Sequence, residues 1–385
     1  MTLGGKVCKK GIWDETIPGI TFDEEGISNY CYLQQKMMAD YPKGEKGKKD
    51  WEDIIRQIKV SGKNKKYDCI IGVSGGVDSS YLLYLAKEYG LKPLAVHLDN
   101  GFNSEIAVNN IHKITSALNI DLKTLVVNYE EMKDLLKSYM IASMPWIDFP
   151  TDLAIKAAMY EMAIKENIHF ILRGNDFRSE GKQPTEWTYS DSKQLQYIHK
   201  KFGSGIKLKT YPLLSFQKLI YAGLIKKTKD VRPFYYLRYN KENAKNALIE
   251  KFEWKDYGGH HHENLFTKFA MAYWLPKKFG IDKRKINLSA QILSGDITRE
   301  YAISKINTPF DTEDNLEKLK EYILKKLAIT EDEFERILMA NNTNYKNYPS
   351  DYNFIHNNIK YFKWLIKRLY SFKPMAIESE ESIKQ

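Results

Sequence analysis

From residue 67 onward, short apolar runs alternate with segments in which apolar residues recur every three or four positions. The runs at 67–73, 93–99, 123–128 and 168–174 have the length and composition of buried strands. The segments between them predict helices over 78–90, 104–120 and 150–167. Strands that alternate with helices in this way predict an α/β fold, a parallel sheet with helices on both of its faces.

The flanking regions have a different pattern. Residues 1–35 are rich in turn formers, and 13–31 predicts a short hairpin. A connector rich in lysine and glycine (43–66) contains one short helix at 51–58, and beyond residue 190 the pattern is mainly helical. We therefore expect an N-terminal hairpin region (1–50), an α/β domain (51–190) and a mainly helical region for substrate or partner binding (191–385).

Composition limits the class of protein further. The chain has 385 residues, 43% of them hydrophobic, and no apolar run approaches the length of a membrane span. Three cysteines make no disulfide framework, so we expect a cytoplasmic protein without stable membrane insertion. The net charge of +10 indicates anionic partners, although dispersed lysine can also serve solubility alone.

The first strand–helix junction reads "IIGVSGGVDSSYLL" at 70–83. Glycine permits positive φ and close backbone approach, so successive N–H groups can converge on one anion at the start of a helix. The backbone and hydroxyl donors that we expect to surround this anion come from Ser74, Gly75, Gly76, Ser79 and Ser80. Asp78 is unusual beside an anion, and it can serve either as the N-cap or as a ligand that holds Mg²⁺ against phosphates.

The string S-G-G-V-D-S resembles the PP-loop of the ATP pyrophosphatases, whose fold is described as adenine nucleotide α-hydrolase-like. These enzymes cleave ATP between the α and β phosphates and place AMP on a substrate oxygen. The resemblance implies ATP and Mg²⁺ as cofactors, with the pyrophosphate held by Ser74, Gly75, Gly76, Asp78 and Ser79. It also places adenosine near the end of the next strand, at His97 and Asp99, which could instead be ordinary polar residues at a strand end.

Members of this group differ in the nucleophile that displaces AMP. Sulfur transfer needs a reactive cysteine, but no cysteine follows Cys69, which lies within an apolar strand. A built-in glutaminase would need a cysteine nucleophile, and neither Cys8 nor Cys31 has a suitable setting. We therefore expect ammonia to come from a separate glutaminase.

Segments spread over 8–305 resemble the N-acetyl sugar amidotransferases of surface-polysaccharide (lipopolysaccharide O-antigen) and flagellar-glycan synthesis. Among them are "FPTDLAIKAAMY", "ILRGNDFRSEG" and "DYGGHHHENLFTKF". The resemblance implies that an N-acetyl group on a nucleotide sugar or nonulosonic acid becomes an acetamidino group. It also implies a glutaminase partner like that of histidine biosynthesis and, as a second candidate partner, a cyclase-like subunit.

One departure from this family concerns metal. The family often carries two C-x-x-C pairs near its N-terminus, whereas Gly11 and Ser28 stand here at the inner positions. Cys8 and Cys31 alone are too few for a closed zinc site, so we expect no zinc.

Further candidate residues follow from the resemblance and from their positions. Lys283 and Arg284 could neutralise the departing pyrophosphate, or they could form a solvated basic cluster. His261 and Glu263 could position or deprotonate ammonium. Gly174, Asn175 and Glu180 follow the fourth strand and are expected near AMP or the sugar, while Trp187 could stack on a sugar ring or belong to the core.

Two other classes of function stay open at this point. A PP-loop ligase that modifies tRNA, of the lysidine-synthase type, also needs no cysteine, although no concentrated basic stripe suggests nucleic acid. A nucleotide-sensing subunit would retain the fold without turnover. The intact loop and the polar residues at each strand end favour an enzyme.

Overall fold

The computed structural model describes residues 3–258 and 263–370. Its centre is a five-stranded sheet in the order β3-β2-β1-β4-β5, in which every neighbouring pair is parallel. The strands are β1 (Cys69–Gly72), β2 (Pro93–Asp99), β3 (Leu122–Val126), β4 (Phe170–Leu172) and β5 (Lys229–Val231). The predicted α/β class with a parallel sheet is therefore confirmed.

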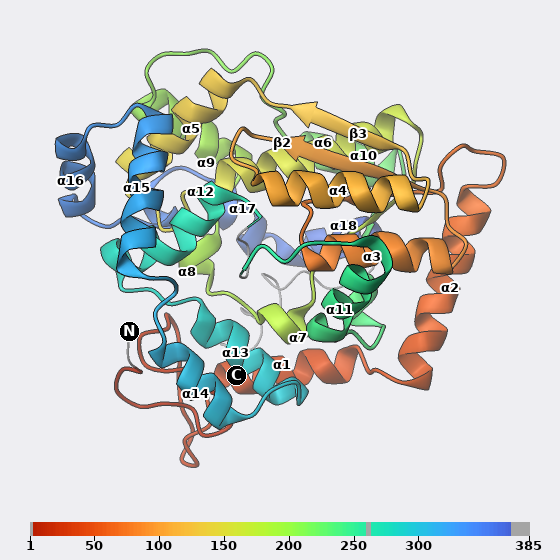
Figure 1. Cartoon of the computed structure of the whole chain (residues 1–385), viewed down its shortest axis with the longest axis horizontal. Coiled ribbons are helices and arrows are strands. Elements are labelled where there is room, and N and C mark those ends of the chain that lie inside the picture. The colour runs from red at the N-terminus through yellow and green to blue at the C-terminus, as the bar shows by residue number, and fades with distance from the viewer. Residues whose placement is uncertain (1–2, 259–262, 371–385) are drawn as a thin grey trace.

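Both faces of the sheet are covered by helices. Successive strand residues alternate between two cores: Ile70 and Ile171 lie in one, and Ile71 and Leu172 in the other. The second core also contains residues of α2 (Glu45–Ser61), α3 (Val77–Glu88), α4 (Glu105–Ala117) and α11 (Lys241–Phe252). Figure 1 looks onto the face that α3, α4 and α11 cover.

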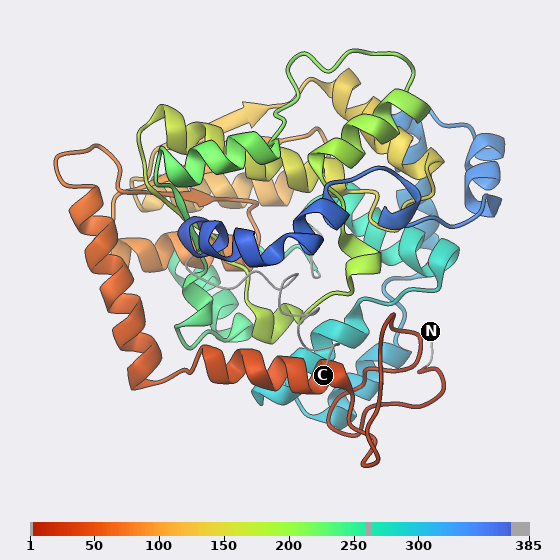
Figure 2. The same ribbon diagram turned by 180° about the vertical axis from the view of Figure 1, so that it is seen from behind.

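The opposite face packs against α6 (Phe149–Lys165), which contacts β1, β2 and β4. Seen from behind in Figure 2, the green α10 (Phe216–Leu224) and the blue α18 (Ile359–Leu369) lie side by side on this face. Four more helices occur between β3 and β5 in the chain: α5 (Tyr129–Ile141), α7 (Phe177–Glu180), α8 (Thr185–Thr188) and α9 (Ser192–Phe202).

The C-terminal part is helical, as predicted. It comprises α12 (Leu265–Phe269), which continues into a wide π-type helix (Ala270–Phe279), then α13 (Arg284–Ser294), α14 (Arg299–Asn307), α15 (Glu313–Leu327), α16 (Glu331–Met339) and α17 (Tyr352–Asn357). Short 3₁₀ turns occur at Pro233–Tyr235 and Tyr345–Asn347. Among the helices described, none combines the length and the apolar composition that a bilayer crossing requires.

Two sequence predictions need correction. The sheet has a fifth strand, β5, which lies in the region predicted to be mainly helical and is only three residues long, too short to show a periodicity. The predicted hairpin at 13–31 is represented by two isolated antiparallel bridges, Val7–Asp14 and Phe22–Ser28. Its last residues already belong to α1 (Asn29–Asp40), which begins at the cap residue Ser28. The division into three regions stays a prediction.

A buried ion pair fastens the N-terminal region to α13. Lys285 Nζ lies 2.6 Å from Asp14 Oδ2, and the two side chains are 3% and 0% exposed. Lys285 also donates to Thr16 Oγ1 at 3.1 Å. Burial alone would raise the pKa of Asp14, but the hydrogen bonds from Lys285, Thr16 and Gly4 outweigh it and lower that pKa.

We expect Lys285→Met to destabilise the protein by about 3 kcal/mol, because it leaves the buried Asp14 carboxylate without its cation. The matched control is Lys318→Met, which breaks the exposed pair with Asp314 and should cost about 0.5 kcal/mol or less. Urea unfolding at neutral pH measures both values. Equal, small effects of the two variants would contradict the prediction.

Candidate active site

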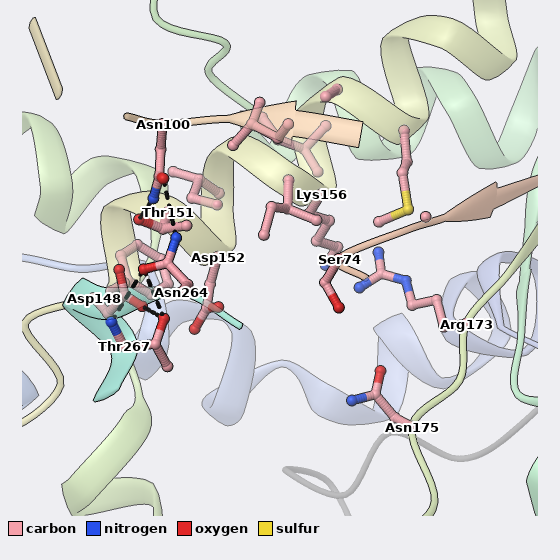
Figure 3. Close-up of a pocket in the computed structure, with 18 of the residues that line it drawn as sticks. Ser74, Asn100, Asp148, Thr151, Asp152, Lys156, Arg173, Asn175, Asn264 and Thr267 are labelled. Carbon is pink, nitrogen blue, oxygen red and sulfur yellow. Dashed lines mark hydrogen bonds between the residues drawn. The ribbon is translucent and has the colours of Figure 1, made fainter. Parts of the chain in front are cut away.

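A cavity of about 650 Å³ opens at the carboxyl ends of the strands. The strand order changes direction between β1 and β4, and ligands of open parallel sheets collect at such a switch point. Ser74 follows β1 and Gly174 follows β4, and both line the cavity. Figure 3 shows Ser74, Lys156, Arg173 and Asn175 on one side of it, and Asn100, Asp148, Thr151, Asn264 and Thr267 gathered on the other.

The glycine loop (residues 74–79) joins β1 to α3. Gly75 has a φ of +81°, and a Cβ at this position would lie 2.2 Å from the carbonyl oxygen of Ala107 in α4. The carbonyl of Gly75 accepts hydrogen bonds from Trp254 Nε1 at 3.2 Å and Asn110 Nδ2 at 3.4 Å. Only glycine fits this contact, which holds the loop in a fixed conformation against α4.

The donors of the loop lie close together at the N-terminus of α3. The N–H of Ser74 donates to Ser79 Oγ at 3.2 Å, that of Gly76 donates to Ser74 Oγ at 3.3 Å, and that of Val77 donates to Tyr257 Oη at 3.3 Å. These bonds are at the long end of the normal range, so phosphate oxygens could replace their acceptors at little cost. With the dipole of α3 behind them, these groups suit a pyrophosphate.

Asp78 is not the N-cap of α3, because Gly76 occupies that position. The Asp78 carboxylate instead accepts from Tyr239 Oη and lies 3.3 Å from Lys241 Nζ. Burial alone would lower the pKa of Lys241, but attraction to Asp78, Glu263 and Glu180 outweighs it and raises that pKa. Asp78 lines the cavity, where its predicted role as a Mg²⁺ ligand remains a prediction.

Glu263 lies directly over the glycine loop. Its Oε1 accepts from Ser74 Oγ at 3.4 Å, and the backbone carbonyl of Glu263 accepts from the N–H of Ser104. Two carboxylates, Asp78 and Glu263, thus flank the phosphate loop, and one or two carboxylates together with substrate phosphates are a usual ligand set for Mg²⁺. His261, the other residue predicted to act on ammonium, lies outside the described residues.

His97 lines the cavity, whereas Asp99 does not. The His97 ring lies 2.9 Å from the carbonyl of Val73 through Nδ1 and 3.2 Å from Asn103 Nδ2 through Nε2. This arrangement suits a neutral ring that donates from Nδ1, and burial lowers the pKa of His97. Asp99 accepts from the N–H of Gly101 in the turn after β2.

The segment after β4 reaches the cavity as predicted. Gly174 packs against the backbone of Asp78, where a Cβ would lie 2.9 Å from the carbonyl carbon. Asn175 and Glu180 both line the cavity, and Asn175 Nδ2 donates to Glu180 Oε2 at 3.3 Å.

Gly75 and Gly76, like Asp99, are absent from the cavity lining, and so are three further predicted site residues. Ser80 is buried within α3 and is absent from the lining. Trp187 is 4% exposed and belongs to the hydrophobic core, which was the alternative interpretation of this residue. Arg284 pairs with Asp282 at 2.7 Å and stacks on Phe310, so it fixes the start of α13 rather than meeting a phosphate.

Lys283, the neighbour of Arg284, does line the cavity. Its Nζ lies 4.0 Å from the centre of the Trp146 ring, and Trp146 Nε1 donates to Asp152 at 2.6 Å. Burial lowers the pKa of Lys283 to about 8, against the opposing attraction of Asp152, Glu180 and Asp148. A part of the Lys283 side chains is therefore neutral at a mildly alkaline pH.

Sequence reasoning missed a polar network opposite the glycine loop. Asn264 Nδ2 donates to Asn100 Oδ1 and Asn100 Nδ2 to Thr151 Oγ1, each at 3.0 Å, while Thr267 Oγ1 donates to Asp148 Oδ2 at 2.5 Å (Figure 3). It also missed three cations in the lining, Lys156, Arg173 and Arg232. Arg173 lies near the end of the strand predicted at 168–174 and could have been found from that position, whereas Arg232 follows the unrecognised β5.

The described part of the chain holds no group of three or more His, Cys, Asp or Glu side chains placed to bind a metal ion.

Cys8 and Cys31 are both fully buried, and the N–H of Ser28 donates to Cys8 Sγ at 3.3 Å. A hydrogen bond from Cys31, together with those from Ser28, outweighs burial and lowers the pKa of Cys8 to about 5.

Two family descriptions match different parts of the chain. Residues 68–153, which contain the glycine loop and His97, match the queuosine biosynthesis protein QueC. The chain contains a PP-loop domain. Residues 263–365 match the C-terminal domain of proteins like the LPS biosynthesis protein WbpG, and this WbpG-like domain supplies Glu263 and Lys283 to the cavity of the PP-loop domain.

A relative in Methanocaldococcus jannaschii, the uncharacterized protein MJ1599, is 38% identical over 103 residues. That match covers 26% of this chain and 36% of the relative, so this chain spans about a third of the length of MJ1599.

Solved structures with a similar chain path include NMN synthetase from Francisella tularensis, at 13% identity and a TM-score of 0.35, covering 78% of this chain and 98% of that one. The U34-tRNA thiolase NcsA from Methanococcus maripaludis, solved with its [4Fe-4S] cluster, has 16% identity and a TM-score of 0.33. The match covers 88% of this chain and 90% of the thiolase. At these values the likenesses carry no conclusion about the activity of this chain.

Proposed function

We propose that the protein is an ATP-dependent, AMP-forming amidotransferase that acts on the N-acetyl group of a sugar. The observation that supports this most is the shared cavity: the PP-loop domain contributes Ser74, Asp78 and Ser79, and the WbpG-like domain contributes Glu263 and Lys283. A phosphate loop and a domain like that of an LPS biosynthesis protein therefore meet at one site.

The proposed reaction has two steps. The amide oxygen of the N-acetyl group attacks the α-phosphorus of ATP, so that an oxygen–phosphorus bond forms and pyrophosphate leaves with the electrons of the broken bond. Ammonia then attacks the carbon of this O-adenylyl imidate, AMP departs with the original amide oxygen, and one proton is released. The product carries an acetamidino group.

The residues of the cavity suit the first step. The loop N–H groups and the α3 N-terminus are placed to bind the pyrophosphate while charge develops on it. Lys283, when protonated, adds a positive charge to the same cavity. Mg²⁺, when bound, would neutralise phosphate charge, and Asp78 and Glu263 are the carboxylates nearest to the loop that could hold it.

For the second step we propose that ammonia comes from a separate glutaminase like that of histidine biosynthesis, with a cyclase-like subunit as a further partner. The chain has three cysteines, and Cys8, Cys31 and Cys69 are all buried. Burial also raises the pKa of the Cys69 thiol far above its ordinary value, which makes it a poor nucleophile.

The deciding experiment supplies Mg-ATP, ammonium chloride and a panel of N-acetylated nucleotide sugars and nonulosonic acids to the full-length protein. Bulk tRNA and the corresponding sugars without the acetyl group form parallel samples. We expect release of AMP and pyrophosphate only with an N-acetylated sugar, and a product in which NH replaces oxygen. With oxygen-18 in the acetyl group, the label should leave in AMP.

Other outcomes have distinct meanings. Release of AMP only with tRNA would replace this proposal with an RNA-modifying ligase. Binding of ATP without pyrophosphate release under any condition would indicate a nucleotide-sensing subunit. Retention of the oxygen-18 label in the sugar product would contradict the adenylated intermediate.

A further inference from the structure

Both ring nitrogens of His97 are engaged inside the protein. Nδ1 lies 2.9 Å from the carbonyl oxygen of Val73, and Nε2 lies 3.2 Å from Asn103 Nδ2. A carbonyl oxygen only accepts hydrogen bonds, so the contact with Val73 requires a proton on Nδ1. Burial, which lowers the pKa of His97, favours the neutral ring. The ring therefore donates to Val73 and accepts from Asn103, and neither nitrogen is left to bind a nucleotide in the cavity.

The amide of Asn103 supports this tautomer independently. Its Nδ2 also faces two acceptors, the carbonyl of Leu98 at 3.4 Å and Asp99 Oδ1 at 3.3 Å. Its Oδ1 accepts from Asn264 Nδ2 at 3.2 Å. These partners fix which end of the amide carries the N–H groups, and that end faces His97. Nε2 of His97 is therefore the acceptor, as the contact of Nδ1 already requires.

The carbonyl that His97 holds stands at the start of the glycine loop. The backbone pairing of β1 with β2 ends where the N–H of Val73 donates to the carbonyl of Val96 at 2.9 Å. The carbonyl of Val73 belongs to the same peptide unit as the N–H of Ser74, which is one of the loop donors. Because a peptide unit is planar, a hydrogen bond to this carbonyl also fixes the direction of the Ser74 N–H.

The same contacts connect the loop to the segment that carries Glu263. Asn103 and Asn264 form an antiparallel bridge, and Glu263 directly precedes Asn264. Glu263 Oε1 accepts from Ser74 Oγ at 3.4 Å. These contacts close a path that leaves the loop through His97 and returns to it through Glu263. The conformation of the loop is thereby coupled to the position of this carboxylate.

We propose that His97 is a positioning residue of the glycine loop and not a ligand of adenosine. Its ring sets the peptide plane between Val73 and Ser74, so that the Ser74 N–H points to the pyrophosphate of ATP. In the structure this N–H donates to Ser79 Oγ at 3.2 Å, a long bond that a phosphate oxygen can replace. The inference rests on the ATP site of the proposed function and assigns His97 a role other than the one that the sequence resemblance implies.

The test measures by calorimetry how the full-length protein binds two fragments of ATP: pyrophosphate with Mg²⁺, and AMP. The variants are His97→Gln and His97→Asn. An asparagine amide can place its N–H close to the position of Nδ1, whereas the longer glutamine side chain places it closer to that of Nε2. The matched control is His169→Gln, which removes a half-buried histidine at the amino end of β4, away from the cavity lining.

We expect His97→Gln to weaken pyrophosphate binding by about 10-fold or more, as the loss of one hydrogen bond to a charged group does. Its affinity for AMP should change by less than about 2-fold, as should both affinities of His169→Gln, because these contacts are independent of the loop. His97→Asn should keep pyrophosphate affinity within about 3-fold of the native value, since it retains a donor to Val73. General damage to the fold would instead weaken both fragments in both His97 variants.

A second measurement examines the tautomer in the native chain, so it does not depend on a variant that folds well. Nitrogen-15 NMR of the histidine rings at neutral pH should show His97 with a proton on Nδ1 and none on Nε2. The His97 signals are assigned by their absence from the spectra of the two variants.

Three results would overturn the inference. A larger loss of affinity for AMP than for pyrophosphate in His97→Gln would make His97 a ligand of adenosine. A ring protonated on Nε2 would contradict both of its contacts. Pyrophosphate binding that is absent from the native chain, or unchanged in His97→Gln, would remove the positioning role. None of these measurements requires AMP formation, so a chain that passes them but releases no AMP with any N-acetylated sugar would count against the proposed function alone.

Discussion

Gly75→Ala is expected to abolish AMP formation, lowering the rate by at least about 100-fold, as the loss of aligned donors at a developing charge does in other enzymes. The added methyl would lie 2.2 Å from the Ala107 carbonyl oxygen and 2.8 Å from its carbonyl carbon. Those atoms belong to the backbone of α4, so they cannot move aside cheaply. The loop must shift instead, and its N–H groups lose their common direction.

A matched control separates this collision from the cost of positive φ. Gly280 has a φ of +67°, and no atom lies within 4 Å of a Cβ placed there, so Gly280→Ala pays only the backbone strain of about 1–2 kcal/mol. Pyrophosphate release, ATP affinity and thermal unfolding are measured for both variants. Gly75→Ala should remain folded with ATP binding weakened, and Gly280→Ala should keep native activity. Native ATP affinity in a folded Gly75→Ala protein would show that this loop does not hold the phosphates.

The sequence was most informative where a local pattern determines the structure. Strand β1, the loop glycines and α3 follow from an apolar run, a need for positive φ and a helical repeat, all within twenty residues. Gly174 and Asn175 could be placed because the carboxyl ends of parallel strands meet at one edge. The predictions for β1, the loop and α3 depend only on neighbours in the chain, and those for Gly174 and Asn175 add only the general rule for parallel sheets.

The remaining parts depend on contacts between distant segments. Strand β5 forms because Lys229–Val231 extends the sheet beside β4, and three residues carry no signal of their own. Lys283 and Arg284 are adjacent cations that the sequence alone does not distinguish. In the structure, Arg284 pairs with Asp282 outside the cavity, whereas Lys283 lies over the Trp146 ring inside it. The network around Asn100 needs Thr151 and Asn264, which only folding brings together.

The charge of Lys283 gives the second large expected effect. Burial beside Trp146 lowers its pKa to about 8, against attraction by Asp152, Glu180 and Asp148, so the cation is present below pH 8 and disappears as the pH rises through that value. If the cation stabilises the departing pyrophosphate, the rate of pyrophosphate release should fall through the same range. Lys283→Met should be slower by about 100-fold at pH 7, since it removes a charge from the reacting centre.

Lys283→Arg provides the matched control, because a guanidinium stays protonated throughout this range. It should retain part of the activity at pH 7 and should lose the decline near pH 8. Pyrophosphate release is followed from pH 6.5 to about 9.5, a range that brackets the lowered pKa, with the concentration of free ammonia held constant, so that only the enzyme titrates. An unchanged decline near pH 8 in Lys283→Arg would assign the titration to another group.

The same shift has a consequence for stability that can be checked independently of activity. The pKa of Lys283 is lower in the folded protein than in the unfolded chain, so the unfolded chain binds more protons between about pH 8 and 10.5. Burial of the charged Lys283 lowers the free energy of unfolding below pH 8, and this loss is relieved as the pH rises through that window. Comparison of urea unfolding for the native chain and Lys283→Met isolates this contribution. The difference in unfolding free energy between the two should shift in favour of the native chain between pH 8 and 10, because the variant has no group there to titrate. A constant difference across that range would show that Lys283 is solvated like an ordinary lysine, and the predicted pH dependence of catalysis would fail with it.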